Sequence, residues 1–220
     1  MKIASSSLAV FFVALAVSAG GPQPFLAWFA ETALILIAAF VLAITYPKFR
    51  FTGLTYLLFL AFALVVFEGA HYTYARAPIG EWMRTAFRFR RNHFDRVGHL
   101  MQGAAPAFVM RELLIRRVGF PRGKALFWVV CGLCLGMAAM FELLEWQYAL
   151  VKHGPAAEDL GAQGDPWDAQ ADMLMAFLGA IGSQLAFSRV HDRQLADERS
   201  IELLNRVSPE QLQSSHHVAS

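Results

Sequence analysis

The sequence predicts an all-α membrane protein: a polytopic helix bundle followed by a short soluble C-terminal tail. One reason is composition, since the 220 residues are 56% hydrophobic and only 16% charged, whereas soluble domains are nearer half apolar and a quarter charged. A second is distribution, because the apolar residues gather in runs of roughly 17 to 23, which cross a hydrocarbon core of about 30 Å. A third is that no segment alternates between polar and apolar residues as a barrel strand would.

About six segments are expected to cross the membrane as helices, because a helix satisfies its own backbone hydrogen bonds in lipid. Residues 1–189 would form the bundle, and residues 190–220 would form the polar tail. The expected spans are 3–19, 26–46, 51–70, 97–115, 125–146 and 173–188.

Turn residues and charges set the limits of these spans in order. Gly20-Gly21-Pro22 precedes the second span, and Tyr46-Pro47-Lys48 separates the second from the third. Arginine-rich loops flank the fourth span, and a glycine-rich loop around Asp165 and Pro166 leads into the sixth. Small residues at helical spacing, including Gly132, Gly136 and Gly179, predict close contact between the last two spans.

The first span has a second interpretation. Lys2, the apolar stretch after it and Val17-Ser18-Ala19 also resemble a signal peptide that ends in small residues before a cleavage point. Either way, the second span starts from the same side of the membrane.

Loop charges favour cytoplasmic N and C termini, because Lys and Arg gather in cytoplasmic loops. That orientation places Lys48, Arg50 and the basic loop 116–124 inside. The loop 76–91 does not follow this charge rule, since it carries five arginines and would lie outside. Its arginines interleave with aromatic residues, a pattern that suits anionic lipid head groups; a solvated basic loop is the other interpretation.

Acidic residues and histidines converge on one side of this topology. Ionisable groups at bilayer depth are costly and are usually paired, inward-facing and functional, and spacings of three or four residues place each pair on one helix face. The pairs are Glu68 with His71, Asp95 with His99, Glu142 with Glu145, and Asp168 with Asp172.

Three interpretations of this cluster stay open. Carboxylate and imidazole ligands suit Zn, Mn or Fe ions, in a site that would activate water or polarise a phosphoryl oxygen. Alternatively, Arg96 or Arg111 pairs with the acids in a structural lock, or the acids carry protons or ions. In the first case the candidate metal ligands are His71, Asp95, His99, Glu142 and Asp172, and the candidate general bases are Glu145 and Asp168.

Three ordered motifs carry a family resemblance. Residues 92–99 (NHFDRVGH), 141–146 (FELLEW) and 164–173 (GDPWDAQADM) resemble the signature blocks of the YjdF-like bacterial inner-membrane proteins. The resemblance implies the inner membrane and no established activity.

A second resemblance is to the VanZ-like membrane proteins, whose Asp-Lys-x-x-His pattern matches Asp95 and His99 with Arg96 in place of lysine. Glu142 and Asp172 match two further motifs of that family, but Ala176 stands where an asparagine is expected. This departure weakens any transfer of residue roles.

The leading hypothesis is a membrane-embedded, metal-dependent enzyme acting on a lipid or lipid-linked head group. The alternative is a non-enzymatic binding protein or a proton- or ion-coupled transporter. Membrane lipids are the expected partners, and nothing predicts nucleic-acid binding. Cys131 and Cys134 lie in an apolar run, where they are expected to act as small apolar side chains. Substrate, metal identity and oligomeric state stay open.

Overall fold

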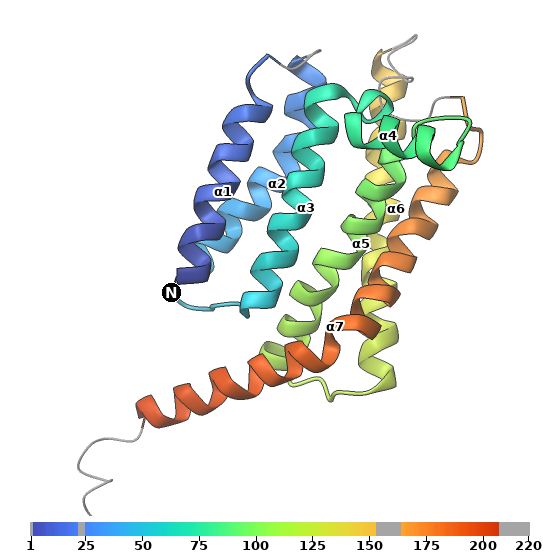
Figure 1. Ribbon diagram of the computed structural model, residues 1–220. Coiled ribbons are helices and arrows are strands. Elements are labelled where there is room, and N and C mark those ends of the chain that lie inside the picture. Colours follow the sequence, from blue (N-terminus) through green and yellow to red (C-terminus); the bar gives the residue numbers. More distant parts are fainter. Residues whose placement is uncertain (1, 22–24, 153–163, 207–220) are drawn as a thin grey trace, which may run out of the picture.

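A computed structural model describes residues 2–21, 25–152 and 164–206, and its elements are helical. Six long helices occupy the expected spans, and a short helix, α4, lies in the arginine-rich loop (Figure 1). The elements are α1 (Lys2–Ser18), α2 (Phe25–Thr45), α3 (Gly53–Tyr72), the 3₁₀ turn η1 (Tyr74–Arg76), α4 (Pro78–Phe87), α5 (Phe94–Leu113), the π-helical η2 (Leu114–Val118), α6 (Lys124–Lys152) and α7 (Asp168–Arg206).

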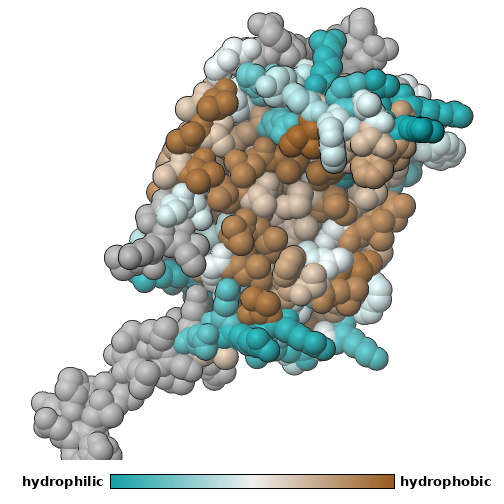
Figure 2. Space-filling view, viewed as in Figure 1, coloured by the Kyte–Doolittle hydropathy of each residue, from teal (hydrophilic) through white to brown (hydrophobic). Residues whose placement is uncertain are grey.

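The surface is that of a membrane protein. Four helices, α2, α3, α6 and α7, are long and apolar enough to cross a bilayer. Figure 2 shows an apolar band across the middle of the face in view, between two hydrophilic margins. The predicted fold class, a helical membrane bundle, is therefore confirmed. Large apolar side chains exposed on the bundle include Phe12, Phe40, Leu57, Trp128 and Leu185.

Helix α5 links two groups of helices: α1 and α2 pack on α3, while α5 packs on α3, α6 and α7 (Figure 1). The contact between α5 and α7 depends on two glycines. A Cβ at Gly103 would collide with the Ala176 carbonyl, and one at Gly179 would collide with the Leu100 carbonyl. The two backbones are therefore in direct contact, as small residues allow between membrane helices.

The glycines of α6 have a different role from the expected one. Helices α6 and α7 do pack together, but Gly132 and Gly136 have nothing within 4 Å of a Cβ built on them. Cys131 and Cys134, in contrast, are buried in an apolar cluster with Phe108. The small-residue motif of α6 therefore faces open space, and its neighbouring face forms the contact.

A helical segment with charged residues lies at each end of the bundle. Helix α4 lies across the end where α3 stops and α5 begins (Figure 1), and it exposes Ile79 and Trp82 while Glu81 pairs with Arg84. At the other end, α7 continues to Arg206, so the chain stays helical well beyond the expected span.

Candidate metal centre at the head of a membrane groove

Three helices bring the candidate ligands together. Asp95 and His99 lie one turn apart on α5, Glu142 lies on α6 and Asp172 lies on α7. Asp172 precedes Ala176 by four residues, so the close α5–α7 contact one turn away holds its side chain beside α5.

The ligand atoms lie at distances that suit a shared cation. One atom each from Asp95, His99 and Asp172 fall within 4.8 Å of one another, and all three residues are buried. His99 Nε2 is 3.5 Å from Asp95 Oδ1, 3.6 Å from Glu142 Oε1 and 3.8 Å from Asp172 Oδ1. These distances exceed an N–H···O hydrogen bond of about 2.7–3.2 Å. They lie near the edge of about 3.3–3.6 Å expected for a tetrahedron with metal–ligand bonds of about 2.0–2.2 Å.

The orientation of His99 supports the same arrangement. Its Nδ1 lies 2.8 Å from Gln102 Oε1, and since an amide oxygen only accepts hydrogen bonds, Nδ1 carries the proton. In the neutral imidazole Nε2 then presents a lone pair toward the three carboxylates. Histidine ligands in metal sites are oriented in this way by a carbonyl or carboxylate on their other nitrogen.

Negative charge at this point is only partly offset by the protein. Glu142 Oε1 is buried and accepts no hydrogen bond from the part of the chain that the structure describes. Arg96 forms an ion pair with Asp172. Asp95, Glu142 and Asp172 carry three negative charges when ionised, and Arg96 is shared between Asp172 and Asp168, so a net negative charge remains that a divalent cation would offset.

A network of arginines holds the start of α7 against α5. Arg96 donates to the side chain and the carbonyl of Asp168 at 2.8 and 3.0 Å, and Arg91 donates to Asp168 and Asp165 at 3.0 and 2.9 Å. The backbone N–H of Trp167, followed by these arginines, lowers the pKa of Asp165. Asp168, a candidate general base, therefore has its carboxylate held by two guanidinium groups.

The other acidic and histidine residues that the sequence singled out do not join this group of ligand atoms. His71 lies on the face of α3 toward α1, with Nδ1 2.8 Å from the Ser18 carbonyl oxygen, and it does not join the group of close ligand atoms. Glu68 accepts from the backbone of Ile79 at the start of α4. Glu145, one turn beyond Glu142, lines a cavity that Asp95 and His99 also line.

That cavity has a volume of about 1220 Å³ and runs along α2, α3, α5 and α6; we call it the groove. It exceeds the roughly 300–1,000 Å³ of typical small-molecule pockets. Among the described residues, α2 packs on α3 and has no comparable contact with α6, so the groove opens between α2 and α6. Its walls reach the apolar surface through exposed lining residues, namely Leu34, Val41, Met140 and Leu144.

Polar residues gather at the head of the groove, while its length is mainly apolar. The head consists of Glu31, Tyr74, Asp95, His99, Gln102 and Glu145. Sequence reasoning missed Tyr74 and Gln102. The position of Gln102 three residues after His99 was the available signal, because this spacing places both side chains on one helix face.

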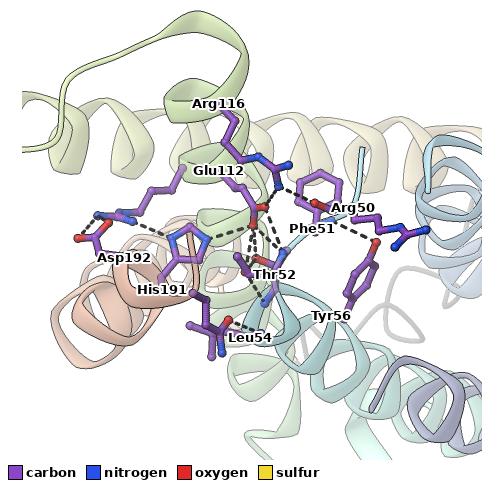
Figure 3. A network of polar contacts seen from close by, with 12 residues as sticks. Arg50, Phe51, Thr52, Leu54, Tyr56, Glu112, Arg116, His191 and Asp192 are labelled. Carbon is purple, nitrogen blue, oxygen red and sulfur yellow. Dashed lines mark hydrogen bonds and ion pairs between the residues drawn. The ribbon is translucent and has the colours of Figure 1, made fainter. Parts of the chain in front are cut away.

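Sequence reasoning also missed a buried network at the opposite end of α5 (Figure 3). Glu112 is fully buried and accepts from Thr52, Thr55, Arg116 and His191 at 2.6–3.1 Å.

This second network ties three helices together. Arg111 Nη1 lies 2.7 Å from His191 Nδ1, and because a guanidinium only donates, the His191 proton is on Nε2, where it is donated to Glu112. Arg111 also pairs with Asp192. Of the two arginines that the structural interpretation offered, Arg96 pairs with the converging acids and Arg111 belongs to this second network. The network joins α5 to α7 and to the start of α3.

Comparisons with known proteins agree with this architecture. The family model described as "Predicted membrane protein (DUF2238)" matches residues 3–193. The chain is 38% identical over 170 residues to the inner membrane protein YjdF of Escherichia coli (strain K12), covering 77% of this chain and 81% of the relative. No solved structure matches.

These findings confirm the YjdF-like resemblance and do not show the VanZ-like one. Together with the four apolar helices, they support a multi-pass protein of the inner membrane. The chain belongs to the DUF2238 family of predicted membrane proteins.

Proposed function

We propose that this protein is a membrane-embedded, metal-dependent enzyme that acts on the head group of a lipid or lipid-linked substrate. One observation carries the proposal: a compact group of three carboxylates and one imidazole lies at the polar head of a large apolar groove. The two parts together match an amphiphilic substrate, with its chains in the groove and its head group beside the metal.

Asp95, His99, Glu142 and Asp172 are the proposed ligands. Three carboxylates and one imidazole suit Zn, Mn or Fe, and a bound divalent ion would offset the negative charge that Arg96 leaves. Such an ion would supply Lewis-acid polarisation of a carbonyl or phosphoryl oxygen. His71, which contacts Ser18 instead, is left out of the proposed ligand set.

The groove supports a lipid substrate. Apart from Arg117 at its far end, its length below the head is formed mainly by apolar side chains from four helices. It opens between α2 and α6, where exposed lining residues are apolar, so acyl or isoprenoid chains would enter sideways from the bilayer. A soluble polar substrate would gain nothing from such a surface.

The reaction class that fits is hydrolysis of an ester or phosphoester in the head group. Water attacks the carbonyl carbon or phosphorus, Glu145 accepts the water proton, the bond to the leaving oxygen breaks, and that oxygen takes up the proton from Glu145. Glu145 suits the role because it lines the groove one turn from Glu142. Asp168 is assigned to positioning, since it holds Arg96 beside Asp172.

Proton or ion coupling is less well supported. Transport across the membrane requires polar groups along the path, but α5 carries no titratable side chain between Gln102 and Arg111. The head of the groove and the Glu112 network are therefore separated by two turns of apolar helix.

The test begins with metal content. The full-length protein in lipid nanodiscs is loaded with zinc, manganese or iron(II), desalted and measured by elemental mass spectrometry. We expect about one ion per chain in the wild type, strong loss in His99→Gln and Asp172→Asn, and no loss in the control Glu81→Gln, whose carboxylate is exposed and pairs with Arg84. A wild type that retains none of the three metals would overturn the proposal.

Activity is then measured as head-group release from a panel of phospholipids and lipid-linked phosphates, with and without chelator. Release that a chelator abolishes and the same metal restores supports the enzyme. Metal binding without release from any substrate, together with proton-gradient-dependent uptake, would replace the enzyme with a transporter.

A further inference from the structure

Two polar groups at the head of the groove lie outside the proposed metal ligands and have no hydrogen-bond partner among the described residues. Glu31 Oε2, on α2, is buried and accepts no hydrogen bond from the described residues. The hydroxyl of Tyr74, in the turn between α3 and α4, likewise makes no hydrogen bond within the described parts of the chain. Both residues line the groove. Buried polar groups are usually paired, so a buried acceptor beside an unused donor points to a ligand.

The backbone holds Tyr74 in its position. A Cβ at Gly69 or Gly98 would meet the Tyr74 ring at 3.0 Å or less, so the ring lies in a slot between α3 and α5 that only glycines leave open. The preceding residue, Thr73, has φ 63 and ψ 141, a conformation that non-glycine residues rarely adopt and that surrounding structure must enforce. The strained backbone of Thr73 therefore directs the Tyr74 ring into the slot.

We infer that Glu31 and Tyr74 form a head-group subsite that selects a lipid carrying a primary ammonium group. The inference rests on the proposed function, because it names the substrate class of the same groove. Glu31 would accept an N–H of the ammonium, and the Tyr74 hydroxyl, a donor at neutral pH, would bond an oxygen of the adjoining phosphate or ester.

Charge favours an ammonium over a neutral head group. A divalent ion would offset the ligand carboxylates, and Glu31 and Glu145 are two further acids at the head of the groove, which carry negative charge when ionised. A sugar or glycerol hydroxyl would satisfy Glu31 Oε2 geometrically but would not offset this charge. A quaternary ammonium would offset the charge, but it has no N–H to donate. A primary ammonium does both.

The experiment is a lipid competition read by native mass spectrometry. Purified full-length protein is exchanged into detergent with equimolar phosphatidylethanolamine, phosphatidylglycerol and phosphatidylcholine of identical acyl chains, and the retained lipid is counted. We expect phosphatidylethanolamine to be enriched by about tenfold or more over the other two, the scale of one charge-assisted hydrogen bond.

Near-isosteric variants identify the residues responsible. Glu31→Gln should abolish the enrichment over phosphatidylcholine, and Tyr74→Phe, which keeps the ring in its glycine slot, should reduce retention of phosphatidylethanolamine. Glu81→Gln, an exposed acid on α4 outside the groove, should retain wild-type selectivity. Equal retention of all three lipids by the wild type, preference for phosphatidylglycerol, or unchanged selectivity in Glu31→Gln would each overturn the inference.

A chelator-treated sample separates this inference from the proposed function. If the protein retains no metal but still selects phosphatidylethanolamine through Glu31, the subsite stands and the metal-dependent enzyme fails. If metal binding requires His99 while selectivity is absent, the metal centre stands and the subsite fails.

Discussion

His99 and Gln102 are joined by a contact of 2.8 Å between Nδ1 and Oε1 on one face of α5. This contact assigns the ring proton to Nδ1 and aims Nε2 at Asp95, Glu142 and Asp172. Gln102 thus determines which ring nitrogen of His99 faces the carboxylates.

The first prediction concerns Gln102. Gln102→Leu keeps a side chain of similar size but removes the carbonyl that orients His99, so metal affinity should fall by about 10–100-fold, as for other partners of metal-bound histidines. Competition with a chelating dye measures the affinity, and Gln147→Leu, at an exposed position on α6, is the control. Unchanged affinity in Gln102→Leu would show that the ring is oriented by other contacts.

The second prediction separates catalysis from architecture. Glu145→Gln keeps size and some hydrogen bonding but cannot accept the water proton, so turnover should fall by about 10² or more. Metal content and thermal stability should stay near wild type, since Glu145 is outside the proposed ligand set. A folded and fully active Glu145→Gln protein would remove this residue from the mechanism.

The third prediction uses the open face of α6. Gly136 lines the groove and has nothing within 4 Å of a built Cβ, so Gly136→Leu should fill the groove without a backbone clash. Leucine also has the higher helix propensity. We expect lower lipid retention and lower turnover with unchanged metal content. Gly103→Leu, aimed at the Ala176 carbonyl, should instead disrupt the α5–α7 contact and lower thermal stability.

The fourth prediction concerns the buried network at the other end of α5. Removing one partner of a buried ion pair costs about 3–5 kcal/mol because the other charge is left uncompensated. Glu112→Ala removes the carboxylate that pairs with Arg116 and accepts the Nε2–H of His191 and the hydroxyls of Thr52 and Thr55, so it should lower thermal stability strongly. Asp192→Ala, whose carboxylate is 35% exposed, should cost much less. Loss of metal binding in a folded Glu112→Ala protein would contradict the purely structural role.

The convergence of Asp95, His99, Glu142 and Asp172 was predictable because chain reversal between apolar runs decides which helix ends share a side. The rotation of each helix about its axis was not. His71 stands at the correct end of α3, but its face turns toward α1 and Ser18. Which neighbour a helix face meets depends on packing of the whole bundle, and spacing within one helix does not contain that information.

Two other misses have the same physical origin. The glycine spacing predicted contact between α6 and α7, and these helices do pack together. The glycines do not form that contact, however: Gly132 and Gly136 line the groove, and Gly179 packs on α5. Glu112 bonds Thr52 and His191, which lie 60 and 79 residues away in sequence. Long-range partners of this kind follow from the fold and leave no local pattern.

The last prediction is the orientation of the bundle. We expect six crossings with both termini in the cytoplasm, because Lys48, Arg50 and the loop 116–124 carry the positive charges that mark cytoplasmic loops. Reporter fusions after Arg50 and Arg122 should read cytoplasmic. A fusion after Pro155, which lies outside the described residues, should read external, on the side of the candidate metal centre. Helix α4 lies at that same end, where its exposed Trp82 suits a membrane interface.

A cytoplasmic signal at Pro155 would reverse the predicted orientation and place the head of the groove in the inner leaflet. The cluster itself would be unaffected, because its distances depend on helix packing and not on the side from which the substrate comes.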